Sequence, residues 1–270
     1  MVAFLQKLFG ASAAVVAPLA SLPKGRRVYA IGDVHGRLDL LAALAAAIES
    51  DDAALAPAQS SVILLGDLID RGAESAGVVD FAREWQDRRD VRVLAGNHEE
   101  MFLKSFDNAE VLRHFLRHGG KETLLSFGMS WSAYATATVE KVREMMAEVV
   151  PAEDRAFIEG LEDKIAIGDY LFVHAGIEPE MPIEDQKPAD LRWIREPFLS
   201  HAGPHPLMVV HGHTITQEPV DNGIRIGIDT GAYASGRLTA LVLEGKQRRF
   251  LEASKAEDGT FATRLYAMTA

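Results

Sequence analysis

Short groups of aspartate, histidine, asparagine and glycine follow several apolar segments of this chain. The first group is Gly32-Asp33-Val34-His35-Gly36, which ends an apolar run. Two glycines permit a tight turn and a close approach of the backbone to a bound group. An aspartate and a histidine two positions apart can point the same way from an extended segment. The pentapeptide is therefore either part of a metal site or a turn with an unrelated histidine.

Four further segments repeat this association of polar residues with the end of an apolar run. They are GDLIDRG at 66–72, GNHE at 96–99, VHAG at 173–176 and HGHT at 211–214. Ligands of open α/β sheets cluster at the carboxyl ends of the strands. The intervals from Asp33 to Asp67 and from Asp67 to Asn97 each match the length of one β-α-β unit. The five segments together therefore predict a single site.

The residue types in these segments indicate which metal chemistry is available. Aspartate, asparagine and histidine offer only oxygen and imidazole ligands, and the chain has no cysteine. That mixture suits Mn, Fe or Zn rather than a soft thiolate site. The ligands are too many for one catalytic ion that keeps open positions. Two ions about 3.5–4 Å apart that share a carboxylate fit better, and such a pair supports in-line attack at phosphorus.

The segments between the motifs alternate between strand and helix patterns. Apolar runs predict strands at 27–31, 61–65 and 91–94, with helices after residue 38 and over 76–86 between them. This β-α-β-α-β order predicts a parallel sheet with helices outside it. Residues 99–162 have a mostly helical pattern. Short strands are then predicted at 170–173, 207–210, 224–228, 237–243 and 247–251.

Composition and charge limit the class of protein. The 270 residues are 48% hydrophobic and 25% charged, which is typical of a globular domain. The net charge of −11 argues against nucleic-acid binding, which depends on lysine and arginine. The apolar N-terminal stretch loosely resembles a secretory signal, but it lacks early positive charge and is too short to span a bilayer. We therefore expect a cytoplasmic protein without a membrane anchor, with an N-terminal arm at 1–25 that contains a short amphipathic helix from Val2 to Phe9.

In combination, the five motifs resemble the PPP family of metallophosphatases, within the calcineurin-like phosphoesterase superfamily. The similarity is greatest to its bacterial and bacteriophage serine/threonine phosphatase branch, and it covers about residues 27–243. The resemblance implies an α/β fold with a central β-sandwich of mixed sheets flanked by helices. The implied domain occupies 26–252, carries a helical insertion at about 100–165, and is followed by a C-terminal tail at 253–270.

The resemblance also implies a role for each site residue. The implied metal ligands are Asp33 and His35 at the first ion, Asp67 between the ions, and Asn97, His174 and His213 at the second. The implied phosphate ligands are Arg71, Asn97 and Arg195, with nearby Arg192 as the alternative to Arg195. His98 is the implied general acid at the leaving oxygen, and Asp70 orients it.

The implied activity is hydrolysis of phosphomonoesters by direct attack of a metal-bridging hydroxide. The expected substrates are phosphoserine and phosphothreonine in proteins, and the expected cofactor is two Mn²⁺ ions, with Fe or Zn as alternatives. The nearest alternative is a symmetrical diadenosine tetraphosphatase or another small-molecule phosphoesterase. Such tetraphosphatases typically have Ala at the place of Asp70 and Asp at the place of Glu99, so these two residues favour a protein phosphatase. A non-catalytic scaffold of the same fold is the outside alternative.

Two further features carry their own expectations. His114 and His118 are four residues apart, so they could bind a metal from one helix face, or they could line the cleft. The insertion follows His98 directly and is expected to overhang the cleft. The Asp229-Thr230-Gly231 segment is expected to support the site structurally rather than take part in catalysis.

Overall fold

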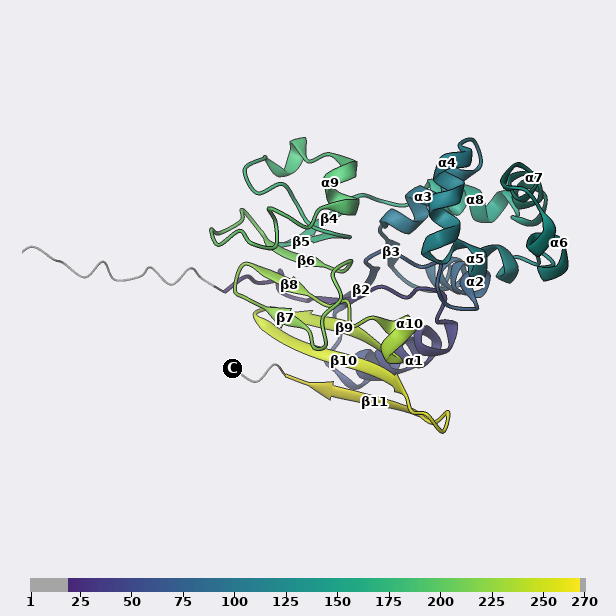
Figure 1. Ribbon diagram of the computed structural model, residues 1–270. Coiled ribbons are helices and arrows are strands. Elements are labelled where there is room, and N and C mark those ends of the chain that lie inside the picture. Colours follow the sequence, from purple (N-terminus) through teal and green to yellow (C-terminus); the bar gives the residue numbers. More distant parts are fainter. Residues whose placement is uncertain (1–18, 268–270) are drawn as a thin grey trace, which may run out of the picture.

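Two mixed β-sheets pack face to face in the computed structural model, which describes residues 19–267 (Figure 1). The six-stranded sheet has the order β11 (Phe261–Tyr266), β10 (Gln247–Lys255), β9 (Arg237–Glu244), β1 (Arg26–Ile31), β2 (Gln59–Leu64) and β3 (Val91–Val93). The five-stranded sheet has the order β4 (Lys164–Ile167), β5 (Tyr170–Val173), β6 (Met208–His211), β8 (Arg225–Gly227) and β7 (Val220–Asp221). The predicted sandwich of mixed sheets is confirmed.

Strand β1 shows why the six-stranded sheet is buried on both faces. Its side chains alternate between the faces, as in any strand. Val28 and Ala30 pack against the other sheet. Tyr29 and Ile31 face the helices α1 (Leu38–Ala54) and α2 (Ser75–Gln86). Cover on both sides explains why this segment of the sequence is a continuous apolar run rather than an alternating pattern.

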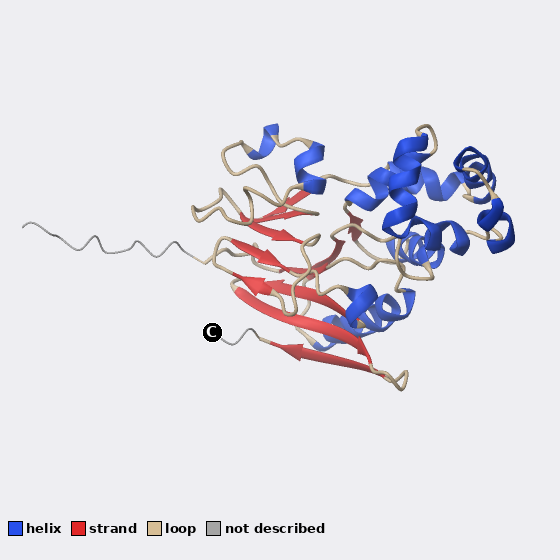
Figure 2. Cartoon of the chain, viewed as in Figure 1, coloured by secondary structure: helices blue, strands red, loops and turns tan. Residues whose placement is uncertain are grey.

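The segment between β3 and β4 is a cluster of short helices. They are α3 (Asn97–Ser105), α4 (Ala109–Phe115), the π-helical turn η1 (Leu116–Gly120), α5 (Lys121–Ser126), α6 (Trp131–Thr136), α7 (Val139–Val149) and α8 (Ala152–Glu159). Figure 2 shows this cluster gathered at one side of the strands. Buried Phe102, Leu112, Phe115 and Met146 join the helices to the core that α1 and α2 share. The cluster is the predicted helical insertion.

The C-terminal residues differ from the predicted tail at 253–270. Strand β10 continues to Lys255, and β11 pairs with it antiparallel, so the sheet extends to Tyr266. Most of β11 is exposed to solvent, and its sequence lacks the alternation of apolar and polar residues that signals a half-buried strand.

The N-terminal part of the described chain packs on the domain. Leu22 is buried beside the core between the sheets, and its N–H donates to the Gly245 carbonyl at 2.9 Å. The predicted helix from Val2 to Phe9 lies outside the described residues. Between residues 19 and 267, no helix has both the length and the apolar character needed to cross a membrane.

Candidate active site

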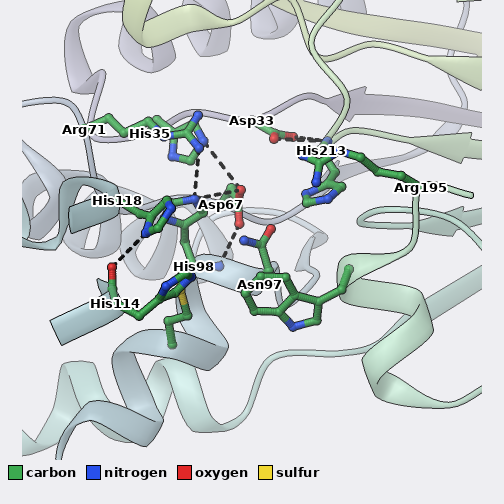
Figure 3. Close-up of a pocket in the computed structure, with 12 residues that line it drawn as sticks. Asp33, His35, Asp67, Arg71, Asn97, His98, His114, His118, Arg195 and His213 are labelled. Carbon is green, nitrogen blue, oxygen red and sulfur yellow. Dashed lines mark hydrogen bonds and ion pairs between the residues drawn. The ribbon is translucent and has the colours of Figure 1, made fainter. Parts of the chain in front are cut away.

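A pocket of about 230 Å³ lies where the loops after β1, β2, β3 and β6 meet (Figure 3). The lining residues are Asp33, His35, Asp67, Arg71, Asn97, His98, Met101, His114, His118, Trp193, Arg195 and His213. Two predicted site residues, Asp70 and His174, do not line the pocket. Both are fully buried and contact residues that do: Asp70 bonds to His98, and His174 Nε2 lies 3.1 Å from Asn97 Oδ1. The structure therefore brings all the predicted site residues together.

Asp67 is shared by two groups of possible metal ligands. One group is His35, Asp67 and His98, and the other is Asp67, His174 and His213. Within each group the ligand atoms lie within 4.8 Å of one another. Asp67 Oδ2 is 3.5 Å from His35 Nε2, whereas Asp67 Oδ1 is 3.4 Å from His174 Nε2. The two oxygens of one carboxylate thus face two different imidazoles, so Asp67 is placed to serve both groups.

The histidines are oriented so that a ring nitrogen is free to bind a cation. His35 Nδ1 lies 2.8 Å from the Ile69 carbonyl oxygen, and His174 Nδ1 lies 2.8 Å from that of Leu65. Each Nδ1–H therefore donates to a carbonyl, which leaves Nε2 of His35 with its lone pair, the arrangement typical of metal-binding histidines. His174 Nε2 instead contacts Asn97 Oδ1, so a metal there would replace that contact. His213 Nε2 is buried, and no residue of the described chain hydrogen-bonds to it.

Two glycines let the backbone lie close to the carboxylates of Asp33 and Asp67, which a metal site would use. A Cβ at position 212 would lie 2.1 Å from Asp33 Oδ1, and a Cβ at position 96 would lie 2.1 Å from Asp67 Oδ1. Only glycine fits at either position. The His213 N–H also donates to Asp33, at 3.1 Å from each carboxylate oxygen. Together with the imidazole and amide ligands, this donor set fits two divalent cations such as Mn, Fe or Zn.

Burial and nearby charges keep Asp67, His35 and His213 in their metal-binding forms, whereas burial and the charges of Asp229 and Asp67 raise the pKa of Asp33. Burial opposes ionisation of Asp67, but the imidazoles of His174 and His98 outweigh it, and the pKa of Asp67 falls below its usual range. Burial lowers the pKa of His35 to about 3, and that of His213 to about 3 as well. Near neutral pH the Asp67 carboxylate is therefore ionised and these imidazoles are neutral, which is the state that binds metal.

Backbone strain is concentrated at this site. Among described residues other than glycine, positive φ angles occur at His35 (46°), Asp67 (50°), Asp70 (74°), Arg71 (69°) and His213 (60°). Left-handed backbone is uncommon for such residues and costs of the order of 1–3 kcal/mol where it persists. All five are predicted site residues, so the fold holds an unfavourable backbone conformation where it aims these side chains.

His98 and Asp70 form a buried pair at the start of α3. His98 Nδ1 is 2.5 Å from Asp70 Oδ2, and Thr123 donates its hydroxyl to the other Asp70 oxygen at 2.6 Å. Burial opposes the charged imidazole, but Asp67 and Asp70 outweigh it and raise the pKa of His98. His98 Nε2 points away from Asp70, and Arg71 Nη2 lies 3.1 Å from it.

The two candidate arginines for the second phosphate contact differ in their ion-pair partners. Arg195 lines the pocket, and Figure 3 shows it on the side opposite Arg71. Arg192 instead pairs with Asp163 at 2.6 Å and with Glu100 at 3.3 Å. The geometry favours Arg195, which is free to meet a ligand.

Sequence reasoning assigned no structural role to Glu99, which is fully buried beneath the site. Its carboxylate accepts the N–H groups of Gly96 (2.8 Å), Asp67 (2.9 Å) and Leu68 (2.7 Å). It therefore ties the loop after β2 to the loop after β3. Burial and the nearby Asp67 charge raise the pKa of Glu99 to about 7. A sequence signal existed, because an acidic residue three positions after a helix N-cap commonly accepts backbone N–H groups there.

The insertion contributes two histidines and a methionine to the pocket wall. The rings of His114 and His118 pack at a tilt of 38° with 4.1 Å between their centroids, and His118 Nδ1 bonds to the His114 carbonyl at 2.8 Å. Neither belongs to a group of three candidate ligands within residues 19–267. Both histidines line the cleft beside Met101. Lining the cleft is the second of the two roles expected for His114 and His118.

The sequence and the fold of this chain are similar to those of known phosphoesterases. Residues 26–235 match the sequence profile described as calcineurin-like phosphoesterase. Serine/threonine-protein phosphatase 1 of Salmonella typhimurium is 29% identical over 224 residues, which are 79% of this chain and 90% of that protein. An asymmetrical bis(5'-nucleosyl)-tetraphosphatase of Anoxybacillus flavithermus is 25% identical over 78% of this chain and 88% of its own length. The crystal structure of a provisionally assigned diadenosine tetraphosphatase has a TM-score of 0.59 and 18% identity, and the match covers 93% of this chain and 100% of that one.

Proposed function

Because the chain belongs to the calcineurin-like phosphoesterase family, we propose that it hydrolyses phosphomonoesters with two divalent metal ions, with phosphoserine and phosphothreonine in proteins as its main substrates. The observation that carries this proposal is the position of Asp67, whose two oxygens face separate imidazoles. The Asp70–His98 pair lies beside that carboxylate. A phosphoesterase needs both features, because phosphorus must be attacked and the leaving oxygen must be protonated.

The proposed metal ligands combine the histidines of the two groups that share Asp67 with Asp33 and Asn97 of the pocket wall, and His98 is reserved for proton transfer. Asp33 and His35 would hold one ion, and Asn97, His174 and His213 the other, with Asp67 between them. Bound divalent ions supply charge neutralisation for the phosphoryl oxygens and a water of lowered pKa. The oxygen and imidazole donors favour Mn²⁺, with Fe or Zn as alternatives.

Arg71 and Arg195 are the proposed phosphate ligands on the protein side. The transition state of phosphoryl transfer spreads negative charge over the equatorial oxygens. Planar, always-charged guanidinium groups can donate two parallel N–H bonds to such oxygens. The Asn97 side chain also lines the pocket and can donate to the same phosphate.

His98 is the proposed general acid. An alkoxide is a poor leaving group, so protonation of the leaving oxygen contributes about 10²–10⁴-fold to the rate. Asp70 holds the Nδ1–H of His98, so the proton that is transferred must sit on Nε2. Arg71 Nη2 lies 3.1 Å from Nε2 in the free protein, where Nε2 can only accept, and a bound phosphate would draw that guanidinium toward itself and leave Nε2 free to carry the proton.

A dinucleoside polyphosphate is the second candidate substrate. It is favoured by the 25% identity to a bis(5'-nucleosyl)-tetraphosphatase over most of this chain. Asp70 and Glu99 favour the phosphoprotein over the substrate of a symmetrical diadenosine tetraphosphatase, since enzymes of that kind typically have Ala and Asp at these two positions. A direct comparison of the two substrates separates the candidates.

The deciding experiment is hydrolysis of an aryl phosphate by metal-stripped protein to which Mn²⁺ is returned. We expect restored activity in the wild type and loss of both metal binding and activity in Asp67→Asn. His98→Asn should keep the metal, and in a parallel assay with a phosphoserine peptide, whose leaving group is an alkoxide, it should lose about 10²–10⁴-fold in turnover. Asp80→Asn is the matched control, because Asp80 is exposed and lies outside the pocket. Metal-independent turnover would overturn the proposal. So would wild-type activity in both Asp67→Asn and His98→Asn.

The substrate class needs a separate comparison of a phosphoserine peptide with diadenosine tetraphosphate. We expect a higher kcat/KM for the phosphopeptide. A strong preference for the dinucleotide would assign the chain to the second candidate while leaving the metal chemistry intact.

A further inference from the structure

The guanidinium group of Arg71 points into the pocket without a carboxylate partner. Within residues 19–267, no aspartate or glutamate lies within ion-pair distance of it. Its polar side-chain contact is His98 Nε2 at 3.1 Å. A long, charged side chain in such a position would normally sample several rotamers, and ordering it on phosphate binding would cost conformational entropy.

An aromatic ring supplies the missing support. The guanidinium carbon of Arg71 lies 4.6 Å from the centroid of the Tyr233 ring. A cation over an aromatic face is attracted by the ring quadrupole, and arginine does this most often. The same ring packs edge-on against His35, with centroids 5.5 Å apart and planes at 89°. Tyr233 therefore contacts both a proposed metal ligand and a proposed phosphate ligand.

The short segment that carries Tyr233 is itself well anchored. It is α10 (Ala232–Ser235), in the connection between β8 and β9. Gly231 enters it with φ of 67° and donates its N–H to Asp229 at 2.9 Å. The Ala232 carbonyl accepts a hydrogen bond from Arg37 Nη1 at 2.8 Å. The backbone that carries the ring is thus anchored, although 38% of the Tyr233 surface remains exposed.

We propose that the ring of Tyr233 positions Arg71 for phosphate binding while leaving the N–H donors of the guanidinium free. This inference rests on the proposed phosphoesterase function. A carboxylate could hold Arg71 equally well, but it would accept the same N–H groups that a phosphate must accept and would compete with the substrate. An aromatic face attracts the cation without accepting those donors. In this role Tyr233 is a positioning residue that acts through Arg71, and its hydroxyl group takes no part.

The test uses Mn²⁺-loaded full-length protein and four variants of the pair, which are Tyr233→Phe, Tyr233→Leu, Arg71→Ala and the Arg71→Ala/Tyr233→Leu double variant. Binding of inorganic phosphate is measured by calorimetry, and KM and kcat are measured with an aryl phosphate. Tyr233→Phe keeps the ring and should stay within about 2-fold of the wild-type phosphate affinity. Tyr233→Leu removes the ring and should weaken phosphate binding by roughly 3-fold to 30-fold. KM should rise with it, because a grip on phosphate acts in the ground state as well as the transition state.

A double-mutant cycle separates positioning from general support of the fold. In an Arg71→Ala background, Tyr233→Leu should have no further effect on phosphate binding. The Mn²⁺ affinity of Tyr233→Leu should match that of the wild type. That result would show that the weaker phosphate binding does not come from the lost contact with His35. Trp131→Leu is the matched control, because Trp131 also has a cation over its ring, Lys121 at 5.5 Å, but lies outside the pocket.

Several outcomes would overturn the inference. If Tyr233→Leu weakened phosphate binding equally with and without Arg71, the ring would not act through Arg71. If Tyr233→Phe weakened phosphate binding as much as Tyr233→Leu does, the hydroxyl group would carry the role. If Tyr233→Leu lost Mn²⁺ affinity, the contact with His35 would carry it. If the wild type hydrolyses no phosphoester, the proposed function fails on its own, and the phosphate affinities of the same variants still decide whether Tyr233 positions Arg71.

Discussion

Replacing Gly96 by alanine tests whether the backbone must approach the Asp67 carboxylate so closely. Gly96 has φ of −89° and ψ of 179°, a conformation that alanine adopts freely, so backbone strain plays no part. The added Cβ would lie 2.1 Å from Asp67 Oδ1 and 2.6 Å from the Asp67 backbone nitrogen. Ordinary contact begins near 3.4 Å, so the carboxylate oxygen must move by more than one ångström to admit the methyl group.

That displacement is large compared with what a metal site tolerates. Functional groups must stay within about 0.5 Å of their productive positions, and a misplacement of about 1 Å can cost roughly 10² in rate. We therefore expect Gly96→Ala to lose at least about 10²-fold in kcat/KM and to bind Mn²⁺ more weakly. Overpacking should also lower the free energy of unfolding by about 1–3 kcal/mol.

Calorimetric Mn²⁺ titration, aryl phosphate kinetics and urea unfolding measure the three effects. Gly160→Ala is the matched control, because a Cβ there would lie 3.5 Å from its nearest neighbours and φ is −85°. If Gly96→Ala kept wild-type metal affinity and activity, the close approach to Asp67 would be incidental, and the reasoning from it would be refuted.

Three further predictions concern the support of the site, its metals and the surface. Glu99→Gln should lower the free energy of unfolding by about 2–4 kcal/mol in urea titrations, because an amide –NH₂ would face backbone N–H donors where a buried carboxylate accepts them. Saturating Mn²⁺ should raise the melting temperature of the metal-stripped wild type but not of Asp67→Asn, since a ligand stabilises only the state that binds it. Burial opposes ionisation of Asp39, but hydrogen bonds from Arg37 and Lys255 lower its pKa to about 2. The stabilisation it gives is complete above about pH 4 and is lost as the pH falls toward 2, so the gap in melting temperature between wild type and Asp39→Asn should narrow from pH 6 to pH 3.

The ligand clusters could be predicted because they lie at the ends of parallel strands. β1, β2 and β3 pair in parallel in chain order, so their carboxyl ends, and with them Asp33, Asp67 and Asn97, meet at one edge. The sequence spacing carries this information directly. Elements with strong apolar patterns, such as β1 and β2, have observed bounds close to the predicted ones.

Local sequence marks His174 and His213 at the ends of apolar runs, but it carries no signal for how the two sheets pack together. His174 and His213 follow strands of the second sheet, and only the face-to-face packing of the sheets brings them to Asp67. Tyr233 reaches Arg71 from the connection between β8 and β9, two residues after the Asp229-Thr230-Gly231 segment, and no sequence pattern predicted this contact. β11 escaped prediction for another reason: as an exposed edge strand it has no buried face to impose a pattern.

The position of β1 within its sheet has a consequence for protein synthesis. This strand, which leads into Asp33 and His35, is held between β2 and β9, and β9 ends only at Glu244. A ribosome makes the first ligands early, yet they gain their final support only when a strand from near the other end of the chain pairs with β1. Such distant pairing is slow, so the nascent chain must keep its ligands unassembled for most of its translation. Metal loading of this protein is therefore expected to follow the emergence of residue 244 rather than to accompany synthesis of the motifs.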